Sequence, residues 1–324
     1  MDTPSLLGFG TYNFMGRQYL NNRYFGWPHM SNSLKEKLLY SALENGITFF
    51  DTSDFYGFGN TEKLIGKIIS KNENLFIATK GGKVDYDPSS NSLIGNFSAQ
   101  YIQHSIEASR KRLNIEQISL YQLHGPTLSQ LKNQSLREVL NLAQNSGKIK
   151  HVGISPKRSG LLRDEYIQEI CKNSLIKYVQ MPLSFSQPHT MDVADKFIKS
   201  GKRIIARGIF DHGLLFKQND FSDLEKTDPR ILSYVDNKLK KRIQNYKAVI
   251  VDHANRLAQK RNEAVSIAQF LLLATISTNK CTSILFGGSQ LNHIHKNLKV
   301  LSMKKLSESE LLSFIKDCSH IKRP

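Results

Sequence analysis

Four ionisable side chains stand at or just beyond the ends of three consecutive apolar segments in this sequence. Asp51, Lys80 and His124 each end one of these segments, and Tyr56 follows Asp51 by five residues. The carboxyl ends of parallel strands meet at one face of an α/β fold, where catalytic residues gather. We therefore expect the four side chains to converge on one site.

These residue types suit the delivery of a proton to a carbonyl oxygen. Tyrosine, with an unperturbed pKa of about 10, is a slow acid at neutral pH. A buried Lys80 ammonium beside the phenol is expected to lower the pKa of Tyr56, with Asp51 holding the ammonium in place. An N–H of His124 can orient the carbonyl and stabilise an oxyanion. The sequence shows no nucleophile elbow, metal-ligand cluster or flavin motif. A bound nicotinamide is then the simplest source of hydride.

The bulk composition indicates a globular protein. The chain has 324 residues, of which 40% are hydrophobic and 23% are charged. No apolar run approaches the ~18 residues of a membrane span, and the N-terminus lacks the features of a signal peptide. The three cysteines have no metal-ligand spacing and are expected to be free thiols. These features predict a cytoplasmic protein without a metal or a membrane partner.

The net charge of +17 raises the question of nucleic-acid binding. The basic residues, however, are scattered along helical segments, and the densest group, 238–242, has the spacing of one helix face. We therefore expect a solvated basic surface and no nucleic-acid partner. Such a surface still attracts a polyanion such as a dinucleotide phosphate.

Short apolar runs alternate with helical periods along the whole chain, which predicts a parallel sheet with helical crossovers. No G-x-G-x-x-G fingerprint follows a strand, so we favour a single (β/α)8 barrel of the TIM type over a doubly wound sheet, as one domain over residues 1–324. The eight expected strands are Leu7–Thr11, Ile47–Asp51, Leu75–Lys80, Ile118–His124, Ile149–Ser155, Tyr178–Met181, Arg203–Ala206 and Ser283–Phe286.

Local signals mark the ends of several helices. Capping-box spacing is found at Ser33 with Glu36, Thr127 with Gln130 and Ser307 with Glu310, the last pair opening an extra C-terminal helix over Glu308–Lys316. Helix-stop glycines are expected at Gly46, Gly147 and Gly201.

Three long stretches follow predicted strands and are therefore expected on the catalytic face: Met15–Asn32, Gly81–Phe97 and Arg207–Asp236. Their aromatic residues Tyr19, Trp27 and Tyr86 are predicted to bind substrate, and the alternative is that some of them anchor the loops. Arg17, Arg23 and Arg230 in the same stretches either meet an acidic substrate group or are solvated loop charges.

Motifs spread over nearly the whole chain resemble the aldo-keto reductases. They include residues 8–12 (GFGTY), 51–57 (DTSDFYG), 78–81 (ATKG), 123–124 (LH), 147–155 (GKIKHVGIS), 179–184 (VQMPLS), 209–215 (IFDHGLL) and 286–290 (FGGSQ). The resemblance implies a (β/α)8 enzyme that reduces a small aldehyde or ketone, mostly with NADPH, and the 209–215 segment resembles reductases of sugar-related compounds. Tyr56 would be the general acid, tuned by Lys80 and Asp51, and His124 would orient the carbonyl.

The resemblance also implies a set of cofactor-binding residues. Besides Asp51, these are Gly10, Thr11, Tyr12, Ser155, Gln180, Arg207, Gly208, Ile209, Phe210, Gly213, Gly287, Gly288, Ser289, Gln290, His293, Lys296 and Asn297.

The chain departs from the family pattern at three points. Pro156 stands where an asparagine usually holds the carboxamide, and Arg207 where a tyrosine often stacks on the nicotinamide. Ser289 and His293 occupy positions where an arginine or lysine often grips the 2′-phosphate, and neutral histidine binds phosphate less strongly. We expect NADPH, with NADH possible.

Two other interpretations remain at this level. A slow-turnover, redox-sensing cofactor-binding protein, resembling the channel β-subunits that share the fold, would keep the same four residues. A degenerate member that has lost its cofactor site would show the departures at Pro156 and Ser289. Neither the physiological substrate nor the oligomeric state follows from the sequence.

Overall fold

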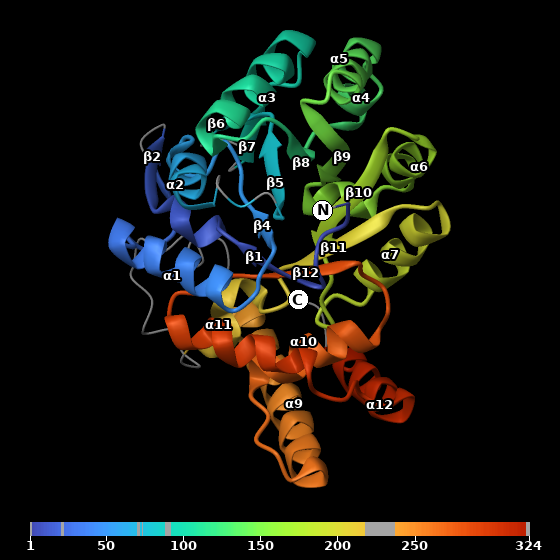
Figure 1. The fold of residues 1–324 in the computed structure, drawn as a ribbon. Helices are drawn as coiled ribbons and strands as arrows, with labels where there is room; N and C mark the ends of the chain where they lie inside the picture. The colour runs from blue at the N-terminus through green and yellow to red at the C-terminus, as the bar shows by residue number, and fades with distance from the viewer. Residues whose placement is uncertain are drawn as a thin grey trace.

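The computed structural model describes residues 2–20, 23–69, 72, 74–87, 92–217 and 237–321. Its centre is a closed barrel of parallel strands in the order β1-β12-β11-β10-β9-β8-β5-β4, with β4 pairing back to β1. Figure 1 shows the helices around the outside of these strands. The barrel strands are β1 (Leu7–Gly10), β4 (Phe49–Asp51), β5 (Phe76–Gly81), β8 (Ile118–His124), β9 (Ile149–Ser155), β10 (Ile176–Pro182), β11 (Arg203–Arg207) and β12 (Ser283–Phe286). The predicted (β/α)8 barrel is confirmed.

Along each barrel strand every second side chain points into the barrel. These inward-facing side chains are apolar inside the barrel and polar at its mouth. Phe49, Phe76, Leu120 and Tyr178 are fully buried and belong to one apolar cluster with Ala78, Ile205 and Leu285. Successive side chains of a strand point to opposite faces. Positions two or four residues further on therefore point inward as well, nearer the carboxyl ends, and these are the residues at Asp51, Lys80, Gln122, His124, Gln180 and Arg207.

The other strand faces pack against helices in a second, larger core that includes Phe9, Phe50 and Tyr121. The helices are α1 (Asn32–Glu44), α2 (Asn60–Ile69), α3 (Ala99–Leu113), α4 (Leu128–Leu131), α5 (Gln134–Asn145), α6 (Asp164–Lys172), α7 (His189–Lys199), α9 (Asn237–Arg261), α10 (Ile267–Ser277), α11 (Leu291–Leu298) and α12 (Glu308–Ser319), with 3-10 helices η1 (Tyr12–Met15), η2 (Arg158–Leu162), η3 (Asp211–Phe216) and η4 (Lys299–Leu301). None of these helices is long and apolar enough to cross a membrane.

Most of the predicted helix signals are present in the structure. The capping boxes at Thr127 and Ser307 both form, and the extra C-terminal helix α12 packs against α9. Gly46, Gly147 and Gly201 are left-handed, at φ values of 80°, 72° and 81°. The predicted cap at Ser33 is wrong: α1 starts earlier, because the Ser31 hydroxyl accepts the hydrogen bond of the Leu34 amide.

Two of the long stretches that were expected to be loops contain antiparallel hairpins. The first pairs β2 (Arg17–Leu20) with β3 (Arg23–Gly26), and the second pairs β6 (Lys83–Asp87) with β7 (Ser92–Gly95). The third stretch begins with η3, and its residues 218–236 lie outside the described part. The second hairpin carries Lys83 directly after the end of β5, beside the mouth of the barrel.

Candidate active site

The Lys80 ammonium lies at the centre of the site at the mouth of the barrel and bonds to three groups around it. Its Nζ donates to Asp51 Oδ1 at 2.5 Å, to the Thr52 carbonyl at 2.8 Å and to Tyr56 Oη at 3.4 Å. All three of its protons therefore have acceptors. Lys80 and Asp51 lie almost entirely out of solvent, with side chains 1% and 5% exposed. The ammonium thus joins the carboxylate to the phenol, as the sequence analysis expected.

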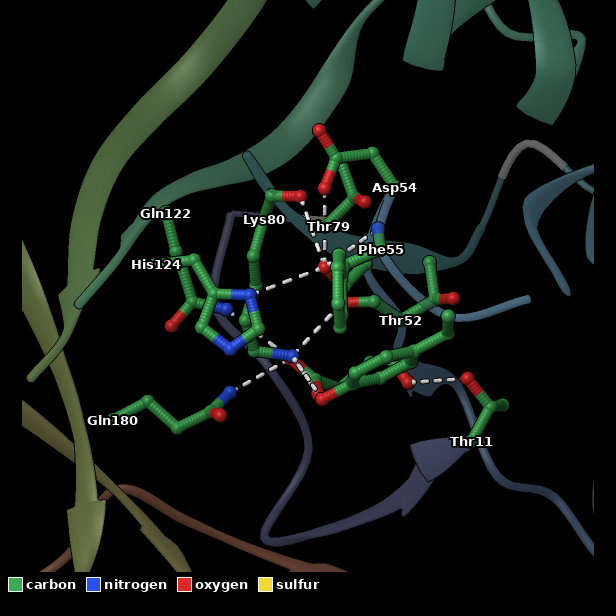
Figure 2. Close-up of polar contacts among 12 residues, drawn as sticks. Thr11, Thr52, Asp54, Phe55, Thr79, Lys80, Gln122, His124 and Gln180 are labelled. Carbon is green, nitrogen blue, oxygen red and sulfur yellow. Dashed lines mark hydrogen bonds and ion pairs between the residues drawn. The ribbon is translucent and has the colours of Figure 1, made fainter. Parts of the chain in front are cut away.

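Two amide side chains complete the surroundings of Asp51. Its Oδ2 accepts hydrogen bonds from Gln180 Nε2 at 2.7 Å and from Gln122 Nε2 at 3.1 Å, and Figure 2 shows both glutamines beside Lys80. The sequence analysis assigned Gln180 to the cofactor and missed Gln122. Its position two residues before His124 on an inward-facing strand was the available signal. With both oxygens bonded, Asp51 is fixed in orientation.

Burial raises the pKa of Tyr56 above its ordinary value, and the nearby Asp51 charge adds to the rise while Arg207 opposes it. The expected lowering by Lys80 is not found, because the loss of water around the phenol outweighs the ammonium. Burial also lowers the pKa of Lys80, and the Asp51 charge opposes that shift. The phenol is therefore protonated at neutral pH and holds a proton that it can donate.

His124 faces the same space from the end of β8. Burial, together with the positive charges of Lys83, Lys80 and Arg207, holds its pKa well below the ordinary value, so the ring is neutral. Its Nδ1 lies 3.2 Å from the Ser53 hydroxyl, and the two rings of Tyr56 and His124 meet edge to face at 6.3 Å. A neutral imidazole carries a single N–H, which suits it to donate one hydrogen bond.

A buried polar network continues behind Ser53. The Ser53 hydroxyl lies 3.3 Å from Asp54 Oδ1, and Ser105 donates to Asp54 Oδ2 at 2.9 Å. Burial and the neighbouring Glu62 charge raise the pKa of Asp54 to about 7, while hydrogen bonds from Ser105 and Ser53 and the charge of Arg112 oppose the shift. The carboxyl next to the site is thus partly protonated at neutral pH.

A cavity of about 1290 Å³ opens over this centre and continues along the ends of β11 and β12. Asp51, Tyr56 and His124 line it, and Lys80 lies behind them. The predicted cofactor residues that line it are Gly10, Tyr12, Asp51, Ser155, Gln180, Arg207, Gly208, Ile209, Phe210, Gly213, Gly287, Ser289, Gln290, His293, Lys296 and Asn297. The volume exceeds that of a single small-molecule pocket, so a dinucleotide and a substrate can share it.

Comparison with known proteins identifies the family to which this chain belongs. The sequence pattern of the aldo/keto reductase family matches residues 6–316. The chain belongs to the aldo/keto reductase family. An uncharacterized oxidoreductase of Bacillus subtilis is 26% identical over 276 residues, which are 85% of this chain and 84% of the relative. An aldo-keto reductase of Schizosaccharomyces pombe, whose name specifies NADP(+), is 30% identical over 165 residues, or 50% of this chain and 45% of that protein. The glycerol dehydrogenase structure from Gluconobacter oxydans superposes with a TM-score of 0.78 at 23% identity, over 98% of this chain and 93% of that one.

Two residues assigned to the aldo/keto reductase cofactor site do not line the cavity. The Thr11 hydroxyl and amide both donate to the Asp51 carbonyl, at 2.9 and 3.0 Å, so Thr11 supports the strand that carries the carboxylate. The Gly288 carbonyl accepts a hydrogen bond from Asn13 Nδ2 at 2.8 Å. Both residues therefore hold the walls of the cavity in place.

Two details of the cavity wall suit a dinucleotide. Gly208 has a φ of 68°, and a Cβ at that position would have no neighbour within 4 Å, so the backbone is open to a ligand. The buried Asn13 Oδ1 has no hydrogen-bond partner among the described residues and lies beside Gly287. A buried acceptor of this kind is costly unless a ligand or water donates to it.

Two of the departures from the family pattern contact each other. Arg207 Nη2 donates to the Pro156 carbonyl at 3.4 Å, across the mouth between β9 and β11. Pro156 has no amide of its own to donate, and its carbonyl helps to position the guanidinium. Gln180 Nε2 donates a hydrogen bond to Asp51. Its Oε1 is therefore the atom that can accept a hydrogen bond from the carboxamide N–H of a nicotinamide.

The far end of the cavity contains few fixed cations. Burial and the neighbouring Lys296 charge lower the pKa of His293, so this ring is neutral at pH 7. Ser289 and Gln290 line the same end without charge. Among the described lining residues, Lys296 on α11 is a cation beside His293, and Lys217 after η3 lines the cavity as well.

The three predicted substrate residues have different outcomes in the structure. Trp27 lines the cavity and meets the Tyr12 ring edge to face at 5.6 Å, and Tyr12 lies 5.2 Å from the Tyr56 ring. Tyr19 is 57% exposed and is not part of the lining. The side chain of Tyr86 lies outside the described residues. Trp27 is therefore the aromatic residue of the three that is placed to meet a substrate.

The predicted arginines do not supply a charge in the described part of the cavity. Arg17 is exposed and is not part of the lining, while the side chain of Arg23 and the whole of Arg230 lie outside the described residues. Lys83 and Lys157 line the cavity instead, and the sequence analysis missed both. Their signal was position: each lies within three residues of a strand end that carries a predicted site residue.

Proposed function

We propose that this protein is an NAD(P)H-dependent carbonyl reductase that converts a small aldehyde or ketone into the alcohol. The observation that carries the proposal is the Lys80 ammonium, which bonds Asp51 and Tyr56 simultaneously beneath an open cavity. A bound nicotinamide would supply hydride to the carbonyl carbon. The family membership supports the reaction class.

Each residue of the centre has a distinct part in this proposal. Tyr56, protonated because it is buried, gives its proton to the carbonyl oxygen. Lys80 then stabilises the resulting phenolate through the bond that it already makes to Oη. His124 donates the N–H that faces the cavity to the same carbonyl oxygen. Because Nδ1 contacts the Ser53 hydroxyl, the N–H that this proposal requires at the carbonyl oxygen is that of Nε2.

NADPH is the proposed cofactor, held by the residues between Gly287 and Asn297 and by the strand-end set around Gln180. The Lys296 charge beside His293 in the cavity lining supports a phosphate-bearing cofactor. The NADP(+)-specified relative supports the same choice. Because His293 is neutral, it adds no charge for the 2′-phosphate. The preference in affinity for NADPH over NADH is therefore expected to be modest.

The test combines cofactor binding with turnover. Purified protein is titrated with NADPH and with NADH by nicotinamide fluorescence, and then assayed with a panel of aldehydes, ketones and sugars. Tyr56→Phe keeps the ring and loses the acidic hydroxyl. We expect its kcat to fall by at least 100-fold, in line with the 10²–10⁴-fold typical of general acid catalysis. Its affinity for NADPH should stay within a factor of about two.

Three outcomes separate the alternatives. Full activity in Tyr56→Phe would remove the phenol from the acid role. Tight NADPH binding without turnover on any carbonyl compound would favour a redox-sensing cofactor-binding protein. Failure to bind either nucleotide would refute the reductase proposal.

A further inference from the structure

The Ser53 hydroxyl lies between His124 and a carboxyl group that the proposed function does not use. Its Oγ is 3.2 Å from His124 Nδ1 and 3.3 Å from Asp54 Oδ1, and the dashed lines in Figure 2 join it to both residues. It is also 3.2 Å from the Lys80 carbonyl, and it accepts the hydrogen bond of the Phe55 amide at 3.2 Å. Ser53 is fully buried, so solvent does not compete for these contacts.

The number of protons on this hydroxyl limits how the contacts can be made. A serine hydroxyl donates one hydrogen bond and accepts two, and the Phe55 amide already takes one of its lone pairs. The Lys80 carbonyl has the Asp54 amide as a donor at 3.1 Å, whereas His124 Nδ1 has no other hydrogen-bond partner among the described residues. Two arrangements then satisfy both neighbours. Ser53 either donates to His124 and accepts from Asp54, or accepts from His124 and donates to Asp54.

The second oxygen of Asp54 determines where a proton on this carboxyl lies. Oδ2 accepts from the Ser105 hydroxyl at 2.9 Å, and Ser105 in turn accepts from the Tyr121 hydroxyl at 2.9 Å. These hydroxyls therefore supply a donor to Oδ2. A protonated Asp54 consequently carries its proton on Oδ1, where it can donate to Ser53.

A second carboxylate, Glu62, makes Asp54 easy to protonate. Glu62 is fully buried, and its oxygens accept from the Thr79 hydroxyl and from Arg112 Nε, each at 2.6 Å. The hydrogen bonds to the Asp54 side chain in the described structure come from two hydroxyls and not from a cation. Burial and the Glu62 charge raise the pKa of Asp54 to about 7, against the opposing hydroxyls and the Arg112 charge.

Other titratable and charged groups surround this carboxyl and the imidazole. Those that act on Asp54 are Glu62 on α2, Tyr101 and Arg112 on α3, Tyr121 on β8, Lys80 on β5, Lys83 on β6 and Tyr56; those that act on His124 are Lys80, Lys83 and Arg207. Burial raises the pKa of each of these tyrosines, so the phenols are neutral at pH 7. Burial and the cations keep His124 neutral as well, so a change of its ring near pH 7 is a change of tautomer. Lys83 also titrates near neutrality, because burial and the neighbouring positive charges lower its pKa to about 7.

We propose that Ser53 and Asp54 are positioning residues that select which nitrogen of His124 carries the ring proton. With Asp54 protonated, the carboxyl donates to Ser53, Ser53 donates to Nδ1, and the ring proton is on Nε2. With Asp54 ionised, Ser53 donates to the carboxylate, Nδ1–H donates to Ser53, and Nε2 has no proton to give.

One proton separates the two states of this Asp54–Ser53–His124 relay. In passing from the first to the second, Nε2 releases its proton to the cavity, the Ser53 proton passes to Nδ1, and the Asp54 proton passes to Ser53. The inference rests on the proposed reductase function, in which Nε2–H donates to the carbonyl oxygen. It makes carbonyl reduction depend on a proton that is held on Asp54.

The tautomer of His124 tests the relay directly and does not require turnover. Protein labelled with ¹⁵N at histidine is compared by NMR at pH 6 and pH 8.5, and the His124 signals are assigned by their loss in His124→Gln. We expect Nε2–H at pH 6 and Nδ1–H at pH 8.5 in the wild-type protein. The same tautomer at both pH values would overturn the relay, even where carbonyl compounds are reduced and the proposed function stands.

Asp54→Asn should hold the relay in its low-pH arrangement. The Ser105 hydroxyl donates to the amide oxygen, so the amide nitrogen faces Ser53 and donates to it, as the protonated carboxyl would. His124 should then keep Nε2–H at both pH values. Ser53→Ala removes the link between the carboxyl and the ring and should also abolish the change of tautomer. A change in either variant like that of the wild type would contradict the relay.

Ser283→Ala is the matched control for the loss of a buried hydroxyl. Ser283 is fully buried on β12, donates to the Ser5 carbonyl at 2.6 Å and is not part of the cavity lining. Its His124 tautomer should change with pH as in the wild-type protein. Loss of the change in this control as well would show that the effect is not specific to Ser53, and would overturn the proposal.

The pH profile of reduction tests whether the tautomer matters to the reaction. With NADPH and the uncharged 4-nitrobenzaldehyde, kcat/KM of the wild-type protein should fall by roughly 10- to 30-fold from pH 6 to pH 8.5, because Asp54 is then mostly ionised. The fall should shrink to a factor of about two in Asp54→Asn and should persist in Lys83→Met, which removes the other group that titrates near pH 7. A fall that is lost with Lys83 and kept in Asp54→Asn would overturn the proposal. Absence of reduction in every protein would refute the proposed function, whereas the tautomer measurement still decides the relay.

Discussion

Replacement of Lys80 by methionine tests whether the centre depends on the pairing of buried charges. The Lys80 and Asp51 side chains are 1% and 5% exposed, and the two charged atoms lie 2.5 Å apart. At an effective dielectric constant of ~20 the attraction across this distance is about 7 kcal/mol, and much of it is offset by the desolvation of both ions. Without the lysine, Asp51 remains buried and uncompensated. We expect Lys80→Met to destabilise the protein by about 3–5 kcal/mol.

A double variant separates the charge from the packing. Adding Asp51→Asn to Lys80→Met removes the uncompensated carboxylate, while the amide oxygen of the asparagine still accepts from Gln122 or Gln180. We therefore expect the double variant to be more stable than Lys80→Met alone, and the two single effects to be strongly non-additive. The same variants should lose carbonyl reduction, because Tyr56 loses the donor at its oxygen in each variant that lacks Lys80.

Thermal unfolding at pH 7.5 measures these differences. An unfolding entropy of about 2.1 cal/mol/K per residue converts 3–5 kcal/mol into a fall in Tm of roughly 4–8 °C for a chain of this length. Lys111→Met, at an exposed position near the end of α3, serves as the surface control and should change stability by no more than about 0.5 kcal/mol. A double variant that is no more stable than Lys80→Met would refute the charge argument. So would a Lys80→Met protein that matches the control.

Three further predictions concern the rest of the site. Ser289→Arg should tighten NADPH by about 1.5–3 kcal/mol and leave NADH nearly unchanged in parallel fluorescence titrations; equal gains for both would place the 2′-phosphate elsewhere. Asp54 has a folded-state pKa of about 7, above its ordinary 3.8, so its contribution to stability is greatest at low pH and is lost as pH rises from about 4 to 7. Urea unfolding should therefore show Asp54→Asn gaining on the wild type by on the order of 2–4 kcal/mol between pH 5 and pH 8, and a constant difference would contradict the shift. Gly81→Ala should destabilise by roughly 1–3 kcal/mol, because its Cβ would lie 1.9 Å from the buried Tyr121 Oη; Gly10→Ala, whose Cβ would lie no closer than 3.8 Å to a neighbour, is the comparison, and equal losses in Tm would show that contact with Tyr121 is unimportant.

The sequence was sufficient for the barrel and for most of the candidate site because both depend on local periodicity. Alternation along Ile118–His124, Ile149–Ser155 and Ser283–Phe286 marks strands whose bounds the structure reproduces. Because every strand of a parallel barrel ends at the same face, the residues that close β4 and β8 had to meet. The motifs around Tyr56 then indicated the family, which the match over residues 6–316 confirms.

Local periodicity was a poorer guide where secondary structure depends on pairing between distant residues. The two hairpins were expected as loops, since each is held by cross-strand hydrogen bonds rather than by an apolar pattern. The helix α9 covers Asn237–Arg261 and includes the basic group 238–242, whose spacing had indicated one face of a helix.

The tertiary structure alone decided the electrostatics of the cavity. The pKa of Tyr56 rises rather than falls, because burial depends on every element packed around the phenol and not on its one charged neighbour. The contact between Ser53 and His124 likewise joins residues that are 71 positions apart in the chain. The sequence by itself determined that Asp51, Tyr56, Lys80 and His124 meet at the mouth of the barrel, because the strands that carry them all end at that face. Solvent exclusion and the distances between charges, which arise only when the barrel closes, decided which of them are protonated.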